Sequence, residues 1–412
     1  MLERRILTRL RLAGAALAFV VAYTIGAGGR PSDPSKRAEP GRVERFFIPP
    51  ATPIPPAQVA RAQRMARAYV DDGAFPGVVL AVGNRGLLQL STAYGRTAWG
   101  RGAPPASTDS TLYDLASLTK VVATTAAVMA LVEDRRLDLD APVRRYVPEF
   151  AGRNKDRVTI RQLLTHTGGV RAGAFGIASE DPDAVRRYLF RAALALEPGK
   201  EVLYSDIGFV LLWTAAERAA GEPLQRYLKR RVWGPLGMTQ TFVGVRRGCA
   251  RCAPTLQLEG ADEPYRGGSY DEVGRRMRGI AGNAGAFSTG RDLARFAMMI
   301  ANEGRLGNVR VFRPRTVRGF TRAQPGAGTR ALGWEVYCRE GIVPDHRTCK
   351  RVLAFGHTGI TGTSLWIDPA TGTWMVLLTN RTYLPRWDAD MQPIRRRLFR
   401  ALVIPPDSSA AR

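Results

Sequence analysis

Residues 117–134 are the stretch that decides the fold, and they read SLTKVVATTAAVMALVED. The stretch is apolar and rich in alanine, without glycine or proline, so it predicts a long, mostly buried helix. Ser117 and Lys120 stand three positions apart at its start, which brings the hydroxyl and the amine to one helical face. Free backbone N–H groups at a helix start favour negative charge, and this suits an attacking alkoxide.

Lys120 is informative because lysine is rare in this chain. Only six of the 61 basic residues are lysines. Arginine keeps its proton in proteins, whereas a buried lysine can act as a base. The alternative is that Ser117 only caps the helix and Lys120 is a surface charge, but Lys120 leads into the apolar run 121–123. We therefore interpret the pair as a nucleophile and its proton-handling partner.

Strands are predicted near both ends of the chain, with helices between them. A hairpin is expected around a tight turn at 84–86, and turn residues also separate the later strands. The fold class is therefore α/β (α+β): one antiparallel sheet built from N- and C-terminal strands, flanked by helices, with a mostly helical lobe inserted at about 116–284. The expected strands are 77–83, 87–94, 352–357, 364–368 and 373–380, and the expected helices include 58–72, 207–221, 289–303 and 389–402.

The N-terminal region differs in composition from the rest. Arginines precede an apolar run at 12–27, so residues 1–29 predict an export signal or, if uncleaved, an N-terminal membrane anchor. Residues 30–57 are rich in proline and predict a stiff linker. We expect one domain at 58–405, a tail at 406–412, and a periplasmic or other extracytoplasmic location.

The formal net charge of +25 raises the question of nucleic-acid binding. The arginines are spread along the chain and no nucleic-acid reader motif accompanies them, so we expect no nucleic-acid partner. A basic surface that adheres loosely to anionic envelope polymers or lipid heads explains the charge as well.

The four cysteines are even in number, which agrees with disulfides in an oxidising compartment. Sequence neighbours suggest the pairs Cys249–Cys252 and Cys338–Cys349. A cross-link between the two stretches stays open, and so does a zinc site, although the ten residues between Cys338 and Cys349 fit zinc spacing poorly.

The 117–120 motif and its apolar helix resemble the active-site helix of the serine β-lactamases and penicillin-binding proteins. The similarity covers about 60–400. Residues 204–206, Tyr-Ser-Asp, look like the second motif of that family, and residues 357–359, His-Thr-Gly, resemble the third. The nearest group is the class C-like branch, which contains D-alanyl-D-alanine carboxypeptidases, D-aminopeptidases, esterases and class C β-lactamases.

The resemblance implies roles for particular residues. Ser117 attacks a carbonyl, while Lys120 and Tyr204 manage the protons. The N–H groups of Ser117 and Ile360 would stabilise the oxyanion. The substrate-binding set implied by the motifs comprises Ser117, Asp206, His357, Thr358, Gly359 and Ile360.

Two of these residues depart from the family pattern. Asp206 stands where asparagine is commoner; it can cap the following helix, and near Lys120 it would favour the ammonium and move the base role toward Tyr204. His357 stands where lysine is frequent, and a neutral histidine attracts a substrate carboxylate less strongly, which weakens a β-lactamase reading. A second His-Thr-Gly, at His166, has no strand before it, and we interpret it as structural.

The sequence thus predicts a serine hydrolase that forms an acyl-enzyme with a D-amino-acid-containing peptide or an ester, without metal or organic cofactor. Its expected partners are a small molecule or a peptidoglycan peptide, with membrane association through the N-terminus. The alternatives are a class C-like β-lactamase, a catalytically silent wall-binding protein and a metal-dependent hydrolase that uses the cysteines.

Overall fold

Strand β1 (Gly77–Asn84) reads GVVLAVGN, and all eight of its residues are buried, as is typical of an interior strand. The computed structural model describes residues 50–100, 102–174, 177–257, 263–338, 349–383 and 390–404, which all belong to one compact unit, Phe47–Arg412. The predicted N-terminal leader and most of the linker lie outside the described residues.

A six-stranded antiparallel sheet has the order β2-β1-β11-β10-β9-β8. β1 pairs with β11, so that Val78 lies opposite Thr379 and Asn84 opposite Thr373. The prediction of one sheet assembled from both chain ends is confirmed. The other strands of this sheet are β2 (Leu87–Gly95), β8 (Glu335–Cys338), β9 (Val352–Thr358), β10 (Ser364–Ile367) and β11 (Thr373–Thr379).

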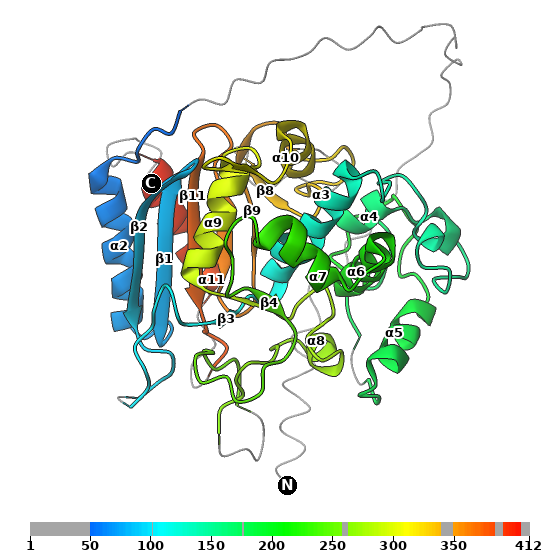
Figure 1. The fold of residues 1–412 in the computed structure, drawn as a ribbon, viewed down its shortest axis with the longest axis horizontal. Coiled ribbons are helices and arrows are strands. Elements are labelled where there is room, and N and C mark those ends of the chain that lie inside the picture. The colour runs from blue at the N-terminus through cyan, green and yellow to red at the C-terminus, as the bar shows by residue number, and fades with distance from the viewer. Residues whose placement is uncertain are drawn as a thin grey trace, which may run out of the picture. The chain divides into compact units, whose positions relative to one another are not determined.

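Side chains alternate along a strand, so each side of the sheet packs against its own apolar core. Val78 and Leu80 of β1 join a core with helices α2 (Pro56–Asp71) and α11 (Met391–Val403). Val79 and Ala81 join the larger core, which includes α9 (Gly290–Ala301). Figure 1 shows the sheet between α2 and α9.

The helical lobe lies beyond α9 in Figure 1, on the side away from α2. Its helices share the larger core with the inner face of the sheet. They are α3 (Ala126–Glu133), α4 (Ile160–Leu164), α5 (Pro182–Arg191), α6 (Asp206–Ala220), α7 (Leu224–Leu228) and α8 (Glu272–Arg276), with shorter turns η3 (Val143–Arg145), η4 (Lys155–Arg157) and η5 (Lys229–Trp233), and α10 (Pro314–Thr321) follows α9.

The stretch from 117 is helical and buried as predicted, but it is not one regular α-helix. A 3-10 turn, η1 (Ala116–Leu118), is followed by a π-helix, η2 (Lys120–Thr125), and then by α3. Two side-chain hydrogen bonds attach the π-helix η2 to its surroundings. Trp233 Nε1 donates to the Val122 carbonyl (3.1 Å), and Thr124 Oγ1 donates to the Gly282 carbonyl (2.6 Å). Such π-helical turns are frequent at functional sites. By length and composition this segment could also span a membrane, but 83% of it is buried inside the protein.

Two small sheets were not predicted. One has the order β3-β5-β4, and its strand β3 (Tyr113–Asp114) immediately precedes the turn that carries Ser117. Runs of two or three residues give no alternation that a sequence reading could detect. The remaining short strands are β4 (Phe242–Val243), β5 (Ala286–Ser288), β6 (Arg305–Leu306) and β7 (Val309–Arg310).

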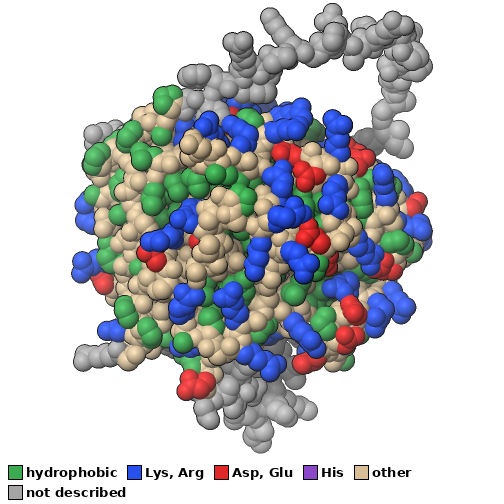
Figure 2. Space-filling view, in the orientation of Figure 1, with side chains coloured by type: hydrophobic (Ala, Val, Ile, Leu, Met, Phe, Trp, Pro, Cys, Tyr) green, Lys and Arg blue, Asp and Glu red, His purple; other side chains and the backbone are tan. Residues whose placement is uncertain are grey.

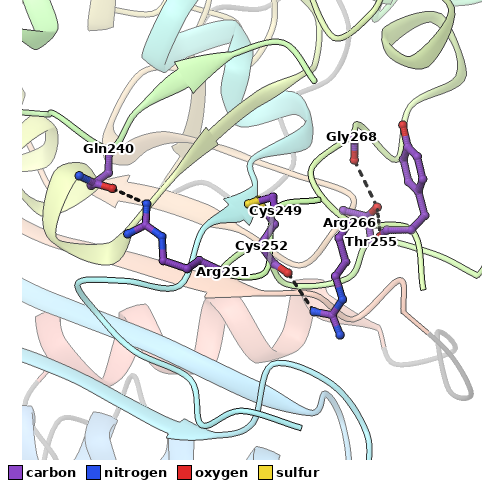
Figure 3. Close-up of a disulfide and its surroundings, with 8 residues drawn as sticks. Gln240, Cys249, Arg251, Cys252, Thr255, Arg266 and Gly268 are labelled. Atoms are coloured by element: carbon purple, nitrogen blue, oxygen red, sulfur yellow. Dashed lines mark hydrogen bonds between the residues drawn. A yellow bond between two sulfur atoms is a disulfide. The ribbon is translucent and has the colours of Figure 1, made fainter. Parts of the chain in front are cut away.

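The cysteines pair as sequence neighbours, Cys249 with Cys252 and Cys338 with Cys349. The first disulfide closes a loop that contacts Leu112, the residue just before β3. Leu112 N–H donates to the Arg251 carbonyl (2.9 Å), and Ala253 N–H donates to the Leu112 carbonyl (2.9 Å). Figure 3 shows this loop, with Arg266 bonded to the Cys252 carbonyl. The second disulfide joins the end of β8 to the residues before β9.

Candidate active site

Ser117 lies in the tight turn between β3 and the helical segment. The preceding residue, Ala116, has a φ of +46°, which is unfavourable for a residue with a Cβ and is held here by its neighbours. Asp114 accepts the Ala116 N–H through Oδ1 (2.9 Å) and the Tyr270 N–H through Oδ2 (2.7 Å). Burial raises the pKa of Asp114 to about 7, against the backbone bonds that lower it.

The Ser117 hydroxyl has two polar side chains against it. Lys120 Nζ donates to Ser117 Oγ at 3.1 Å, and the Tyr204 hydroxyl donates to it at 3.0 Å. Lys120 Nζ also lies 4.8 Å from the centre of the Tyr204 ring. The three groups that the sequence singled out therefore meet at one point, although Tyr204 is 87 positions from Ser117.

The Lys120 ammonium uses all three of its protons. Besides Ser117 it donates to Asp206 Oδ1 (2.6 Å) and to the Asn283 carbonyl (3.1 Å). Burial of the fully enclosed side chain would lower the pKa of Lys120, but the Asp206 carboxylate and the Tyr204 oxygen outweigh it and raise that pKa above its ordinary value. Asp206 thus lies against Lys120, as expected from the sequence.

Asp206 does not cap helix α6, which corrects one expectation. The N-cap is Ser205, whose hydroxyl accepts the Gly208 N–H (2.9 Å) and donates to the Arg171 carbonyl (2.6 Å). The side chain of Asp206, in the first turn, is instead engaged by Lys120. An ion pair with a buried ammonium is stronger than a cap bond, so it decides where the carboxylate points.

His166 lies against the catalytic candidates, which its interpretation as merely structural had not anticipated. Its ring centre lies 4.5 Å from that of Tyr204, and its Nδ1 accepts the Ser205 N–H (3.0 Å). Burial, together with the nearby Arg330 and Lys120 cations, holds the pKa of His166 well below its ordinary value, so the ring is neutral. It packs against the Tyr204 ring.

His357 and Thr358 end strand β9, as predicted for the third motif. His357 Nδ1 donates to the Thr358 carbonyl (2.9 Å), and His357 Nε2 is buried without a hydrogen-bond partner among the described residues. Burial lowers the pKa of His357 to about 3, and the Lys120 and Arg330 charges act in the same direction. His357 is therefore neutral at physiological pH.

The turn 359–363 is attached to the segment that carries Ser117. Thr361 Oγ1 donates to the Asp114 carbonyl (2.8 Å), and Thr363 Oγ1 donates to the Leu115 carbonyl (3.0 Å). On the other side, buried Arg395 donates to the Gly359 carbonyl (2.6 Å). These bonds leave little freedom to the backbone around Ile360, the expected second oxyanion donor.

A cleft of about 980 Å3 opens above these groups. Its lining includes every predicted site residue except the enclosed Lys120. It also includes residues that the sequence reading did not single out: Arg275, Arg330, Arg381 and Arg395. The Arg330 guanidinium carbon lies 5.4 Å from the centre of the Tyr204 ring, and its Nη1 is 4.0 Å from Glu335. One arginine among so many carries no sequence signal, because only the fold selects which ones face the cleft.

Asn283 lies in the glycine-rich loop between α8 and β5. Its carbonyl accepts from Lys120, and its Nδ2 donates to Asp271 Oδ1 (3.1 Å). Asp271 in turn accepts the Gly274 N–H (2.7 Å) as the N-cap of α8. The loop thereby joins the Lys120 pocket to the cleft wall.

Comparison with known proteins agrees with this geometry. Residues 62–398 match the family model described as Beta-lactamase. A protein of Escherichia coli K12 named "Putative D-alanyl-D-alanine carboxypeptidase" is 31% identical over 337 residues, covering 72% of this chain and 78% of that protein.

Solved structures share the fold. A penicillin-binding protein homologue from Caulobacter crescentus matches with a TM-score of 0.68 and 22% identity, over 85% of this chain and 98% of that one. A β-lactamase/D-alanine carboxypeptidase from Pseudomonas syringae matches with a TM-score of 0.65 and 20% identity, over 85% and 100%. The chain therefore belongs to the beta-lactamase family, together with the penicillin-binding proteins, as its 117–120 motif indicated.

Proposed function

We propose that this chain is a serine hydrolase that cleaves the last peptide bond of a peptide ending in a D-residue, as a D-alanyl-D-alanine carboxypeptidase does. The observation that carries the proposal is the convergence of Lys120 Nζ (3.1 Å) and the Tyr204 hydroxyl (3.0 Å) on Ser117 Oγ at the floor of an open cleft. The similarity to the E. coli protein named as a D-alanyl-D-alanine carboxypeptidase supports this substrate class.

In the proposed reaction Ser117 Oγ forms a bond to the substrate carbonyl carbon. Lys120 is held as an ammonium by Asp206, so it orients and stabilises charge rather than accepting a proton. The proton of Ser117 passes to the Tyr204 oxygen while the Tyr204 hydroxyl gives its own proton to the departing amine. The C–N bond breaks, and water later hydrolyses the Ser117 ester by the same route in reverse.

The N–H groups of Ser117 and Ile360 are the proposed oxyanion donors. Neither donates a hydrogen bond within the described part of the chain. The hydrogen bonds that hold residues 359–363 and Ala116 keep these two N–H groups in place before substrate arrives. Electrostatic preorganisation requires such fixed donors.

Arg330 is the proposed partner of the substrate's terminal carboxylate. His357 is neutral and cannot supply that charge. Arg330 borders the same cleft beside Tyr204, and its contact with Glu335 is at the limit of an ion pair. A guanidinium binds a carboxylate through two parallel bonds, so this residue favours acid-ended peptides over neutral esters.

We also propose that the protein acts outside the cytoplasm, anchored or released according to the fate of residues 1–29. The two disulfides support an oxidising compartment. The similarity to wall-related proteins agrees with it.

The test is intact-protein mass spectrometry after challenge with a D-alanyl-D-alanine peptide, a penicillin and an activated ester, alongside an assay of D-alanine release. We expect release of D-alanine from the peptide and an acyl adduct on Ser117, both absent in Ser117→Ala. Turnover of the ester without D-alanine release would assign the protein as an esterase instead of a carboxypeptidase. Turnover of the penicillin without D-alanine release would assign it as a β-lactamase. No adduct and no turnover with any of the three would favour a wall-binding protein.

A further inference from the structure

A second cavity, of about 1270 Å3, adjoins the candidate active site. Glu272 and Arg275 of α8 line both cavities, so α8 forms the wall between them. The far side is made by the segment after β4, the segment around Tyr265 and the residues that follow α8. We call this second cavity the arginine groove.

The arginine groove carries more positive than negative charge. Five arginines line it (247, 266, 275, 276 and 278), against two glutamates, Glu180 and Glu272. Both glutamates are already engaged by one arginine, because Arg276 lies 3.7 Å from Glu180 and 3.2 Å from Glu272. The other arginines have no carboxylate within ion-pair distance among the described residues.

The backbone of the arginine groove is held in place. Arg246 N–H donates to the Gly267 carbonyl (2.8 Å), which joins two of its walls. Arg266 donates from Nη1 to the Cys252 carbonyl (3.0 Å), on the loop closed by the Cys249–Cys252 disulfide (Figure 3). Arg275 donates to the Tyr270 carbonyl at the cleft edge. Because these arginine side chains are already held in place, they lose less conformational entropy when a ligand binds.

The arginine groove is also partly apolar. Val245 is 37% exposed and Ile280 is 41% exposed, and both line it. Tyr265 is the only aromatic side chain among its described lining residues, whereas single-stranded nucleic acids are bound on several aromatic platforms. Guanidinium groups beside short aliphatic side chains fit a peptide with carboxylates better than they fit a nucleic acid.

We propose that the arginine groove is an extended subsite that binds the acidic, N-terminal part of the peptide whose carbonyl reacts at Ser117. The proposal rests on the proposed function for the identity of that peptide. It adds a specificity that the catalytic groups do not have: peptides with carboxylates upstream of the scissile bond bind more tightly than neutral ones of equal length. On the face shown in Figure 2, lysine and arginine side chains are dispersed and do not gather in one patch.

The experiment compares two peptides that end in D-Ala-D-Ala, one with three upstream glutamates and one with three glutamines. Arg247 and Arg278 line the arginine groove and do not line the catalytic cleft, so the double variant Arg247→Gln/Arg278→Gln tests it. Arg64 and Arg144 are exposed elsewhere, and Arg64→Gln/Arg144→Gln is the control with the same change of charge. Thermal unfolding checks that each variant is folded.

We expect the wild type to have a kcat/KM about three- to tenfold higher for the glutamate peptide, a preference that high salt reduces. The ratio should fall to about one in the groove variant and stay at the wild-type value in the control. A preference that survives in the groove variant, or is lost equally in the control, overturns the proposal.

A binding arm separates this proposal from the proposed function. In the Ser117→Ala background, fluorescence anisotropy of the labelled glutamate peptide needs no turnover, and Kd should rise about three- to tenfold with the groove substitutions only. Failure of wild-type D-alanine release with groove-dependent binding would reject the carboxypeptidase and keep the subsite. Displacement of the peptide by oligothymidylate of equal charge at lower concentration would reject the acidic peptide as ligand.

Discussion

Lys120 Nζ and Asp206 Oδ1 lie 2.6 Å apart in a pocket where the lysine side chain has no exposed surface and that of the aspartate is 28% exposed. A lone buried ammonium would shed its proton, whereas this carboxylate keeps it charged. In the proposed reaction this pair therefore sets how protons can be handled at Ser117.

Lys120→Met should lower kcat about 10²–10⁴-fold, because it removes the donor that orients Ser117. Lys155 offers a matched control: it is also buried, and its Nζ donates to the Phe190 carbonyl (2.7 Å) away from the cleft. Lys155→Met should cost about 1–3 kcal/mol of unfolding free energy and leave kcat within a few-fold. The measurements are steady-state kinetics and urea unfolding; equal losses of kcat in both variants would contradict a special role for Lys120.

Asp206→Asn should shift the pH dependence of kcat. Without the carboxylate, burial lowers the pKa of Lys120, so the limb that reports its deprotonation should move to lower pH. Asp140→Asn is the control, since Asp140 pairs with Arg161 on the surface (2.6 Å). An unchanged profile in Asp206→Asn would count against the assignment of the base role to Tyr204.

His166→Ala should lower kcat about 10- to 100-fold with little change in KM, because Tyr204 loses the ring that packs against it. His166→Asn keeps a side-chain acceptor for the Ser205 N–H and tolerates the φ of +58° at this position. If the asparagine variant has wild-type kcat, the ring contact with Tyr204 is not needed and only the hydrogen bond matters.

His357 should make the protein less stable in mild acid. Its pKa of about 3 in the folded state lies below the usual value of 6.5, so the unfolded chain binds the proton more readily. The stabilisation is complete above pH 6.5 and is lost as pH falls toward 3, by roughly 5 kcal/mol at most. His357→Gln should therefore show a flatter dependence of unfolding free energy on pH in that window than the wild type.

Asp114 acts in the opposite direction and must be measured beside His357. Its pKa of about 7 lies above the usual value of 3.8, so its contribution is present at low pH and is lost as pH rises through 7. The comparison of His357→Gln with the wild type cancels this term, because Asp114 is unchanged in both. A His357→Gln profile parallel to that of the wild type would contradict the neutral, buried state of the histidine.

The sequence determined the parts of this protein that depend on local pattern. The apolar run after Lys120 predicted a buried helix, and the runs that became β1, β2, β9, β10 and β11 had the composition and turns of strands. The motifs at 117–120, 204–206 and 357–359 were recognisable because their chemistry needs particular side chains at fixed spacings.

Only the tertiary structure decided what depends on distance in space. The family resemblance placed Asp206 near Lys120, but only the structure shows that Asp206 Oδ1 lies 2.6 Å from Lys120 Nζ, across a separation of 86 positions. Whether His166 touches Tyr204, and which few of many arginines face the cleft, follow from how loops of different elements meet. Side-chain periodicity reports which face of one element is buried, and it carries no information on which distant residue lies across from it.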